Sequence, residues 1–346
     1  MFAHVGTGRA TRKPNPMLYE AIQKEVKDWF GGSSAPATPS DGSAAPANSN
    51  LGPVGTASVE ASWNLFGGLF GGDDKKESDS DQLKAALKDA REQIGIDLAK
   101  DALKDKFKVG EGTGPNAVSK EEFEKIAKLY SDINAGRTDI KFDMSGVDKD
   151  QRAEMHGKSM EDIAKMLQTP AGRKLIGDLA DNETKDPNDA TKMLHHSTTI
   201  RPTDDKTVEN DCDEKGMDAA RAVRDKEAGD AIEKKSSTPG VGTDAIITYH
   251  PGVEKILDGP NVKATGDTTL FHEMVHADHM THGTKVDSSQ VVNNPGDRDN
   301  GTKVEEMATV GLMPARAGND PLLNENEYRR ERAAMNEDMP QRPSYK

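Results

Sequence analysis

Two histidines four residues apart flank a glutamate in His272-Glu273-Met274-Val275-His276. On a helix with about 3.6 residues per turn, residues i and i+4 project from one face, so both imidazoles can bind one metal ion. Glu273 lies next to that face, where its carboxylate can take a proton from a metal-bound water and return it to a leaving amine. The spacing predicts zinc-dependent hydrolysis, with His272 and His276 as zinc ligands and Glu273 as the catalytic acid/base.

The flanks of the motif have the features of a helix. Asp267 or Thr268 can cap an N-terminus, and we expect the helix to run from Thr269 to about His282, with Gly283 ending it. The intervening side chains are mostly apolar, so the remaining faces can be buried. Buried walls exclude water and strengthen the electrostatic effect of a bound ion.

A catalytic zinc site needs a third protein ligand and one open position. His282 follows His272 at the metzincin spacing, but His279 stands where metzincins have the glycine that turns the chain. His279 falls on the ligand face one turn further along, where a supporting role is favoured over a ligand role. Glu305 and its neighbour Glu306 are the remaining candidates, and the alternative for this pair is an exposed acidic pair on a helix.

Composition excludes several classes of function. The chain has 346 residues and a net charge of −14, which argues against nucleic-acid binding and against adhesion to an anionic membrane. Its single cysteine, Cys212, permits neither an internal disulfide nor a cysteine-rich zinc site and favours a reducing compartment. No segment approaches the roughly 20 apolar residues of a membrane span, and no classical secretory signal begins the chain.

Composition also predicts three parts along the chain. Residues 1–80 are expected to form a disordered leader, because much of this stretch consists of small and polar residues. Residues 81–150 read as a helical segment, and residues 151–346 as the metallopeptidase domain. Ser119 is expected to cap one helix, and the Thr169-Pro170 pair to begin another.

The segment Ala245–Tyr249 is the clearest strand in the sequence. Metallopeptidases often bind substrate along a sheet edge by backbone pairing, so this strand is one candidate for that edge. The alternative, an ordinary core strand, has equal support from the sequence. Together with the helices, the strand predicts an α+β fold.

The histidine motif and the acidic motif that follows it resemble the two zinc elements of clostridial neurotoxin light chains. The resemblance rests on His272 through His279, with Gly283 after them, and on Glu305-Glu306-Met307-Ala308-Thr309-Val310-Gly311. It implies that Glu305 is the third zinc ligand and that Glu306 has a supporting role. Ala308 stands where those toxins have an arginine, so that part of their supporting network has no counterpart here.

A broader resemblance, over about residues 155–346, is to the NleD-type zinc metallopeptidases, which are bacterial type III secretion effectors. It is also carried by Thr169-Pro170-Ala171-Gly172, Asp244 to Tyr249, Asn324-Glu325-Asn326-Glu327-Tyr328-Arg329 and Arg342-Pro343-Ser344-Tyr345. The resemblance implies a zincin-like α+β domain that is secreted, acts in the host-cell cytoplasm and cleaves a host protein of the mitogen-activated protein kinase class. The leader would then carry the secretion signal and bind a secretion chaperone.

The C-terminal residues resemble a further catalytic element. Neurotoxin light chains stabilise the oxyanion with an arginine and a tyrosine three positions apart, which is the spacing of Arg342 and Tyr345. The alternative for such terminal residues is an unstructured tail. Tyr328 and Arg330 are the reserve candidates for this role.

Two other classes of function remain open on the sequence. One is a peptidase toxin aimed at competing bacteria, with identical chemistry but another delivery route. The other is a non-enzymatic acidic adaptor in which a zinc site is structural or absent. Metal content and the effect of Glu273→Gln separate the adaptor from the enzymes.

Overall fold

The computed structural model describes residues 76–110, 112–186, 189–205, 208, 210–214, 242–256, 262–286, 290–293, 295–296, 298–313 and 320–345. The chain divides into two compact units, Met1–Ile94 and Gly95–Lys346. All but the last five residues of the predicted leader lie outside the described residues, and the three-part division at residues 80 and 150 stays a prediction. In the part of the chain that is described, no helix is both long and apolar enough to cross a membrane.

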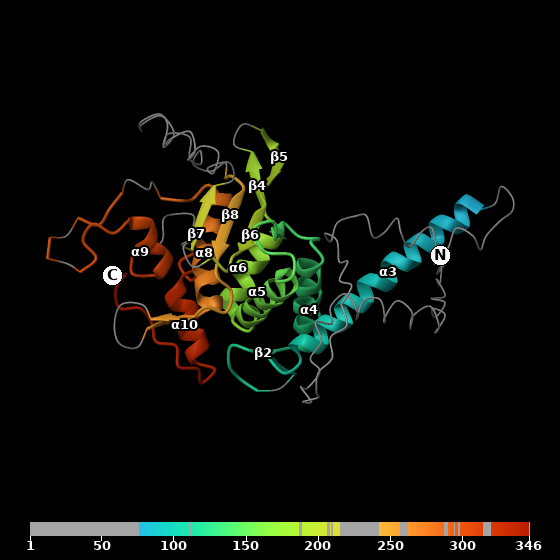
Figure 1. Cartoon of the computed structure of the whole chain (residues 1–346), viewed down its shortest axis with the longest axis horizontal. Helices are drawn as coiled ribbons and strands as arrows, with labels where there is room; N and C mark the ends of the chain where they lie inside the picture. Colours follow the sequence, from blue (N-terminus) through green and yellow to red (C-terminus); the bar gives the residue numbers. More distant parts are fainter. Residues whose placement is uncertain are drawn as a thin grey trace, which may run out of the picture. The chain divides into compact units, whose positions relative to one another are not determined.

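The helices are α3 (Lys76–Leu103), α4 (Lys120–Asn134), α5 (Arg152–Leu167), α6 (Pro170–Ala180), α8 (Gly266–Thr281), α9 (Val304–Val310) and α10 (Glu325–Ala333). The strands are β1 (Lys108–Val109), β2 (Ala117–Val118), β3 (Ile140–Phe142), β4 (Glu183–Asp186), β5 (Asp189–His195), β6 (Thr198–Pro202), β7 (Asp211–Glu214), β8 (Ala245–Tyr249), β9 (Lys255–Ile256) and β10 (Lys263–Ala264). The helices lie mainly in the first and last parts of the described chain, and a run of strands from β4 to β10 separates α6 from α8 (Figure 1).

A mixed four-stranded sheet has the order β3-β6-β8-β7. β3 pairs with β6 and β6 with β8 in parallel, whereas β7 runs antiparallel to β8. β4 and β5 form a separate antiparallel hairpin. Helices packed on this mixed sheet give the expected α+β class, which the structure confirms.

β8 is an interior strand of the sheet. It pairs with β6 on one side and with β7 on the other, and its residues alternate between buried and half-buried. Both sides of its backbone are therefore occupied by ladder hydrogen bonds. The expectation that Ala245–Tyr249 forms a substrate-binding edge is wrong, and the core-strand alternative is correct.

α8 occupies the centre of the domain. It contacts β7 and β8 of the sheet and the helices α5, α6, α9 and α10 (Figure 1). Leu270, Phe271, Met274 and Val275 are fully buried, which places the apolar faces of α8 in the main core. Burial on several sides fixes the helix that carries the two motif histidines, because each apolar side chain buried contributes roughly 1.5–3 kcal/mol.

Local capping follows the sequence closely in two helices. The hydroxyl of Ser119 accepts a hydrogen bond at the start of α4, and that of Thr169 does so for α6, with Pro170 in the first turn. α8 begins earlier than expected, at Gly266. The capping residue is Thr265, whose backbone N–H donates to Thr268 Oγ1 at 2.8 Å, so Thr268 completes a capping box three residues on.

Candidate metal centre

Three side-chain atoms from α8 and α9 converge on one point. His272 Nε2 lies 3.2 Å from His276 Nε2 and 3.3 Å from Glu306 Oε2, and His276 Nε2 lies 3.1 Å from Glu306 Oε2. In the described residues, these three form the one group of histidine and carboxylate side chains with metal-binding spacing. Ligands about 2.0–2.1 Å from a tetrahedral zinc are roughly 3.3 Å apart. His272 Nε2, His276 Nε2 and Glu306 Oε2 form a triangle, the histidine–glutamate triangle, whose dimensions fit a zinc ion.

The other nitrogen of each imidazole contacts a second carboxylate. His272 Nδ1 lies 2.9 Å from Glu325 Oε2 on α10, and His276 Nδ1 lies 3.3 Å from Glu305 Oε1 on α9. A carboxylate at Nδ1 favours the tautomer with its proton there, which leaves the Nε2 lone pair free for a metal. Both rings are thus oriented as ligands by groups far away in the sequence.

Glu305 lies on the opposite side of His276 from the expected ligand position. Its Oε1 is 2.6 Å from His279 Nδ1, and its Oε2 accepts the backbone N–H of Val286 at 2.8 Å. Adjacent helical residues point about 100° apart, so Glu305 and Glu306 cannot both face the Nε2 atoms. The structure places Glu306, and not the expected Glu305, beside the Nε2 atoms of His272 and His276.

Charge is concentrated and buried here. Burial lowers the pKa of His272, but hydrogen bonds with Glu306 and Glu325 outweigh it and raise the pKa to about 10. Hydrogen bonds with Glu305 and Glu306 likewise outweigh burial and raise the pKa of His276 to about 9. Burial alone would raise the pKa of Glu306, yet the two imidazoles hold it well below its usual range. Zinc binding should therefore release protons from the two imidazoles, because only the neutral ring is a metal ligand.

Glu273 is 7% exposed and lies beside the triangle on α8. Its pKa is raised, first by burial and then by the charges of Glu306 and Asp211, against the lowering effect of the two imidazoles. A raised pKa suits a carboxylate that must accept a proton and later return it near neutral pH.

The C-terminal tail lies at the same site. Arg342 Nη1 donates to Glu325 Oε2 at 3.1 Å, and Nη2 donates to the carbonyl of Tyr345 at 2.7 Å. The Tyr345 phenol lies beside Glu306: burial, followed by the charge of this carboxylate, raises the pKa of the phenol. The structure thus brings both predicted tail residues to the histidine–glutamate group.

The alternative candidates lie elsewhere. His282 Nδ1 contacts Asp278, through its carbonyl at 2.9 Å and its carboxylate at 3.1 Å. The Tyr328 hydroxyl donates to Asp267 Oδ2 at 2.6 Å, at the beginning of α8. Arg330 is exposed and pairs with Glu327 on its own helix. His279 contacts Glu305, as expected of a supporting residue.

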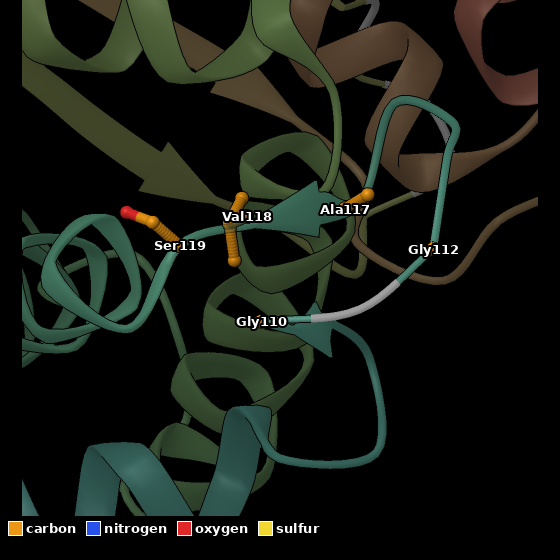
Figure 2. A pocket seen from close by; sticks show the side chains of 5 residues that line it. All are labelled: Gly110, Gly112, Ala117, Val118 and Ser119. Carbon is orange, nitrogen blue, oxygen red and sulfur yellow. The ribbon is translucent and has the colours of Figure 1, made fainter.

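A hollow lies at the N-terminus of α4 and is lined by Gly110, Gly112, Ala117, Val118 and Ser119 (Figure 2). None of these side chains titrates near neutral pH or binds a metal well. The Ser119 hydroxyl already accepts the N–H of Glu122 at 3.0 Å. This hollow therefore holds no catalytic group.

Sequence reasoning missed the role of Glu325. Its two oxygens contact His272 Nδ1, Arg342 Nη1 and, at 2.7 Å, Arg329 Nε. The residue stands in an Asn-Glu-Asn-Glu helix start, which signals a capped N-terminus but not a partner 53 positions away. No local pattern identifies such a contact.

A family match agrees with the chemistry of this site. Residues 143–345, more than half of the chain, match the model of the family Peptidase_M91, described as effector protein. No curated protein matches the chain. Among solved structures, the chain is similar to a botulinum neurotoxin type G light chain, with a TM-score of 0.30 and 14% identity. That match covers 56% of this chain and 56% of the light chain, so it spans little more than half of the toxin's length.

Proposed function

Because this chain belongs to the Peptidase_M91 effector protein family, we propose that it is a zinc endopeptidase that hydrolyses a peptide bond in a host-cell protein. One observation carries the proposal: three ligand atoms lie 3.1–3.3 Å apart, beside a buried glutamate. Two of these atoms belong to imidazoles whose other nitrogens contact carboxylates. This is the construction of a catalytic zinc site with an open position.

We assign the zinc ligands as His272, His276 and Glu306. Glu305 takes the supporting role that the sequence analysis gave to Glu306, because its oxygens contact His279, His276 and the backbone of Val286. Glu325 supports His272 in the same way.

Bound zinc would polarise the scissile carbonyl and lower the pKa of a water molecule to about 7. Glu273 would accept a proton from the attacking water and deliver it to the leaving amine. Arg342 and Tyr345 direct a guanidinium and a phenol at the oxygen on which negative charge develops, the kind of donor that commonly lowers a barrier by about 3–4 kcal/mol.

We propose further that the substrate is a host signalling kinase of the mitogen-activated class, encountered in the host-cell cytoplasm after type III secretion. The resemblance of the zinc elements and of the tail to NleD-type effectors supports this. Residues 1–80 would carry the secretion signal and bind a secretion chaperone. The net charge of −14 suits neither a nucleic acid nor an anionic membrane as a partner.

The decisive experiment compares the wild-type protein with Glu273→Gln. Both variants are expected to bind about one zinc per chain, because Glu273 is not a ligand. Removal of the acid/base group should lower turnover by at least about 10²-fold. N-terminus mapping of treated host lysate should therefore reveal new cleavage sites only with the wild-type protein.

Three other results would change the assignment. Equal cleavage by both variants would remove Glu273 from the mechanism. Zinc binding without cleavage of any lysate protein would favour an adaptor with a structural site. Toxicity of the wild-type protein, but not of the mutant, when expressed in bacteria would favour an antibacterial toxin.

A further inference from the structure

One side chain of α10, Asn326, pairs with the backbone of the tail. The Asn326 amide donates through Nδ2 to the carbonyl of Arg342 at 3.0 Å, and its Oδ1 accepts the N–H of Arg342 at 2.6 Å. One planar amide thus satisfies both backbone groups of one tail residue, as a paired strand would. This double contact fixes the position and the direction of the tail backbone at Arg342.

Arg342, the residue that Asn326 fixes, is connected to the metal centre through Glu325. Arg342 donates to Glu325, the residue directly before Asn326, and Glu325 contacts His272. Three positions further along the tail, the N–H of Tyr345 donates to the buried carboxylate of Asp299 at 2.8 Å. The tail is therefore clamped at Arg342 and Tyr345.

We propose that Asn326 is a positioning residue for the proposed peptidase reaction: it holds the Arg342–Tyr345 tail so that the guanidinium and the phenol face the metal centre. This inference rests on the proposed function. Among the described residues, Asn326 makes its side-chain hydrogen bonds to the backbone of Arg342 and none to the histidine–glutamate triangle, so it acts through Arg342 and Tyr345. Terminal segments fray unless they are tied down, and a displacement of about 1 Å can lower a rate about 10²-fold.

The test compares Asn326→Ala with the wild-type protein in two measurements. In hydrogen exchange with zinc bound, the N–H groups of Arg342 and Tyr345 should exchange faster in the mutant, while those of α8 keep their protection. In turnover of the host protein found by N-terminus mapping, kcat should fall roughly 10- to 100-fold with little change in KM. Zinc stoichiometry should stay unchanged.

A triple mutant, compared with its Tyr345→Phe, Arg342→Ala parent, separates positioning from general stability. If Asn326 acts through the tail, its loss should cost little further activity in a Tyr345→Phe, Arg342→Ala background. Independent effects that multiply would overturn the proposal. Gln341→Ala is the matched control, because it removes an exposed contact between tail and helix at 3.2 Å but leaves both Arg342 bonds in place; it should keep wild-type kcat.

The remaining outcomes are distinguishable. A tail that exchanges as slowly in Asn326→Ala as in the wild-type protein would overturn the inference, and so would a released tail with full kcat. A wild-type protein that binds zinc but cleaves nothing would instead overturn the proposed function, and the inference with it.

Discussion

The two parts of α8 bury charge in opposite ways. At its N-terminal end, Asp267 Oδ2 accepts hydrogen bonds from the Tyr328 hydroxyl at 2.6 Å and from Arg332 Nη1 at 2.7 Å. This carboxylate is balanced by a guanidinium of the protein itself. Such a pair needs nothing from outside, and its role is to hold α10 against the start of α8.

The part that carries the motif has a surplus of negative charge. Its carboxylates are Glu273, Glu305, Glu306 and Glu325, and its guanidiniums are Arg329 and Arg342. When the two imidazoles lose their protons to act as metal ligands, two negative charges remain, and a divalent cation balances them. The comparison teaches that internally paired buried charge is structural, whereas an uncompensated cage of donors is built for a metal.

The strongest way to break this comparison is to remove Glu306. Zinc sites bind with roughly 10–16 kcal/mol, so losing one of three protein ligands should weaken affinity at least about 10³-fold. Glu306→Gln should therefore lack zinc and activity. Glu305→Gln should lose only about 10- to 100-fold in affinity, the typical effect of a supporting group. Competition with a chromogenic chelator measures both, and a larger loss for Glu305→Gln would restore Glu305 as the ligand.

The paired end of α8 is tested by Arg332→Met. Asp267 would stay buried without its guanidinium, which should lower the free energy of unfolding by about 3–5 kcal/mol. Urea denaturation with zinc present measures the change. The double mutant with Asp267→Asn should recover part of the loss; no recovery would mean that Arg332 stabilises the protein through Glu337, its other partner at 2.5 Å.

A smaller effect is expected at Asp162, a buried neighbour of Asp267. In the described residues its Oδ2 has no hydrogen-bond partner, and Lys165 Nζ lies 3.5 Å from Oδ1. Burial, followed by the charge of Asp267, raises the pKa of Asp162 to about 7. The folded protein thus holds a proton that the unfolded chain releases above its usual pKa near 4. Stability contributed by this group is present below that value and is lost as the pH rises to about 7.

Asp162→Asn removes this titration. The mutant should be more stable than the wild-type protein by roughly 1–3 kcal/mol at pH 8, with the difference shrinking toward pH 4. Thermal unfolding followed across this pH range measures it. A difference that does not vary with pH would show that Asp162 is charged throughout.

The local part of the site could be predicted from the sequence. The spacing of His272 and His276 is a property of one helix, and the caps at Ser119 and Thr169 need only neighbours within one turn. The α+β class and the effector peptidase family could also be predicted, because the His272–His276 motif and the distant pair Glu305-Glu306 occur together. Each of these features depends on residues close in sequence or on a recognisable combination of motifs.

The choice between Glu305 and Glu306 could not be predicted. It depends on how α9 is rotated about its axis against α8, which is set by packing and by the contact with Val286. The role of Glu325 and the clamp by Asn326 are likewise contacts between distant segments. The position of β8 inside the sheet depends on β7, whose acidic sequence gives little sign of a strand.

Glu325 and Glu305, which contact the Nδ1 atoms of the two imidazoles, also bear on whether zinc binds before or after the domain folds. Donors that are already aimed lose little freedom on capturing an ion, and the helices that carry them are stabilised by a large apolar core. Folding of this domain should then precede metallation and proceed without it, unlike the zinc fingers that are unfolded when metal-free. A chain that emerges into a new compartment could fold first and acquire its zinc there.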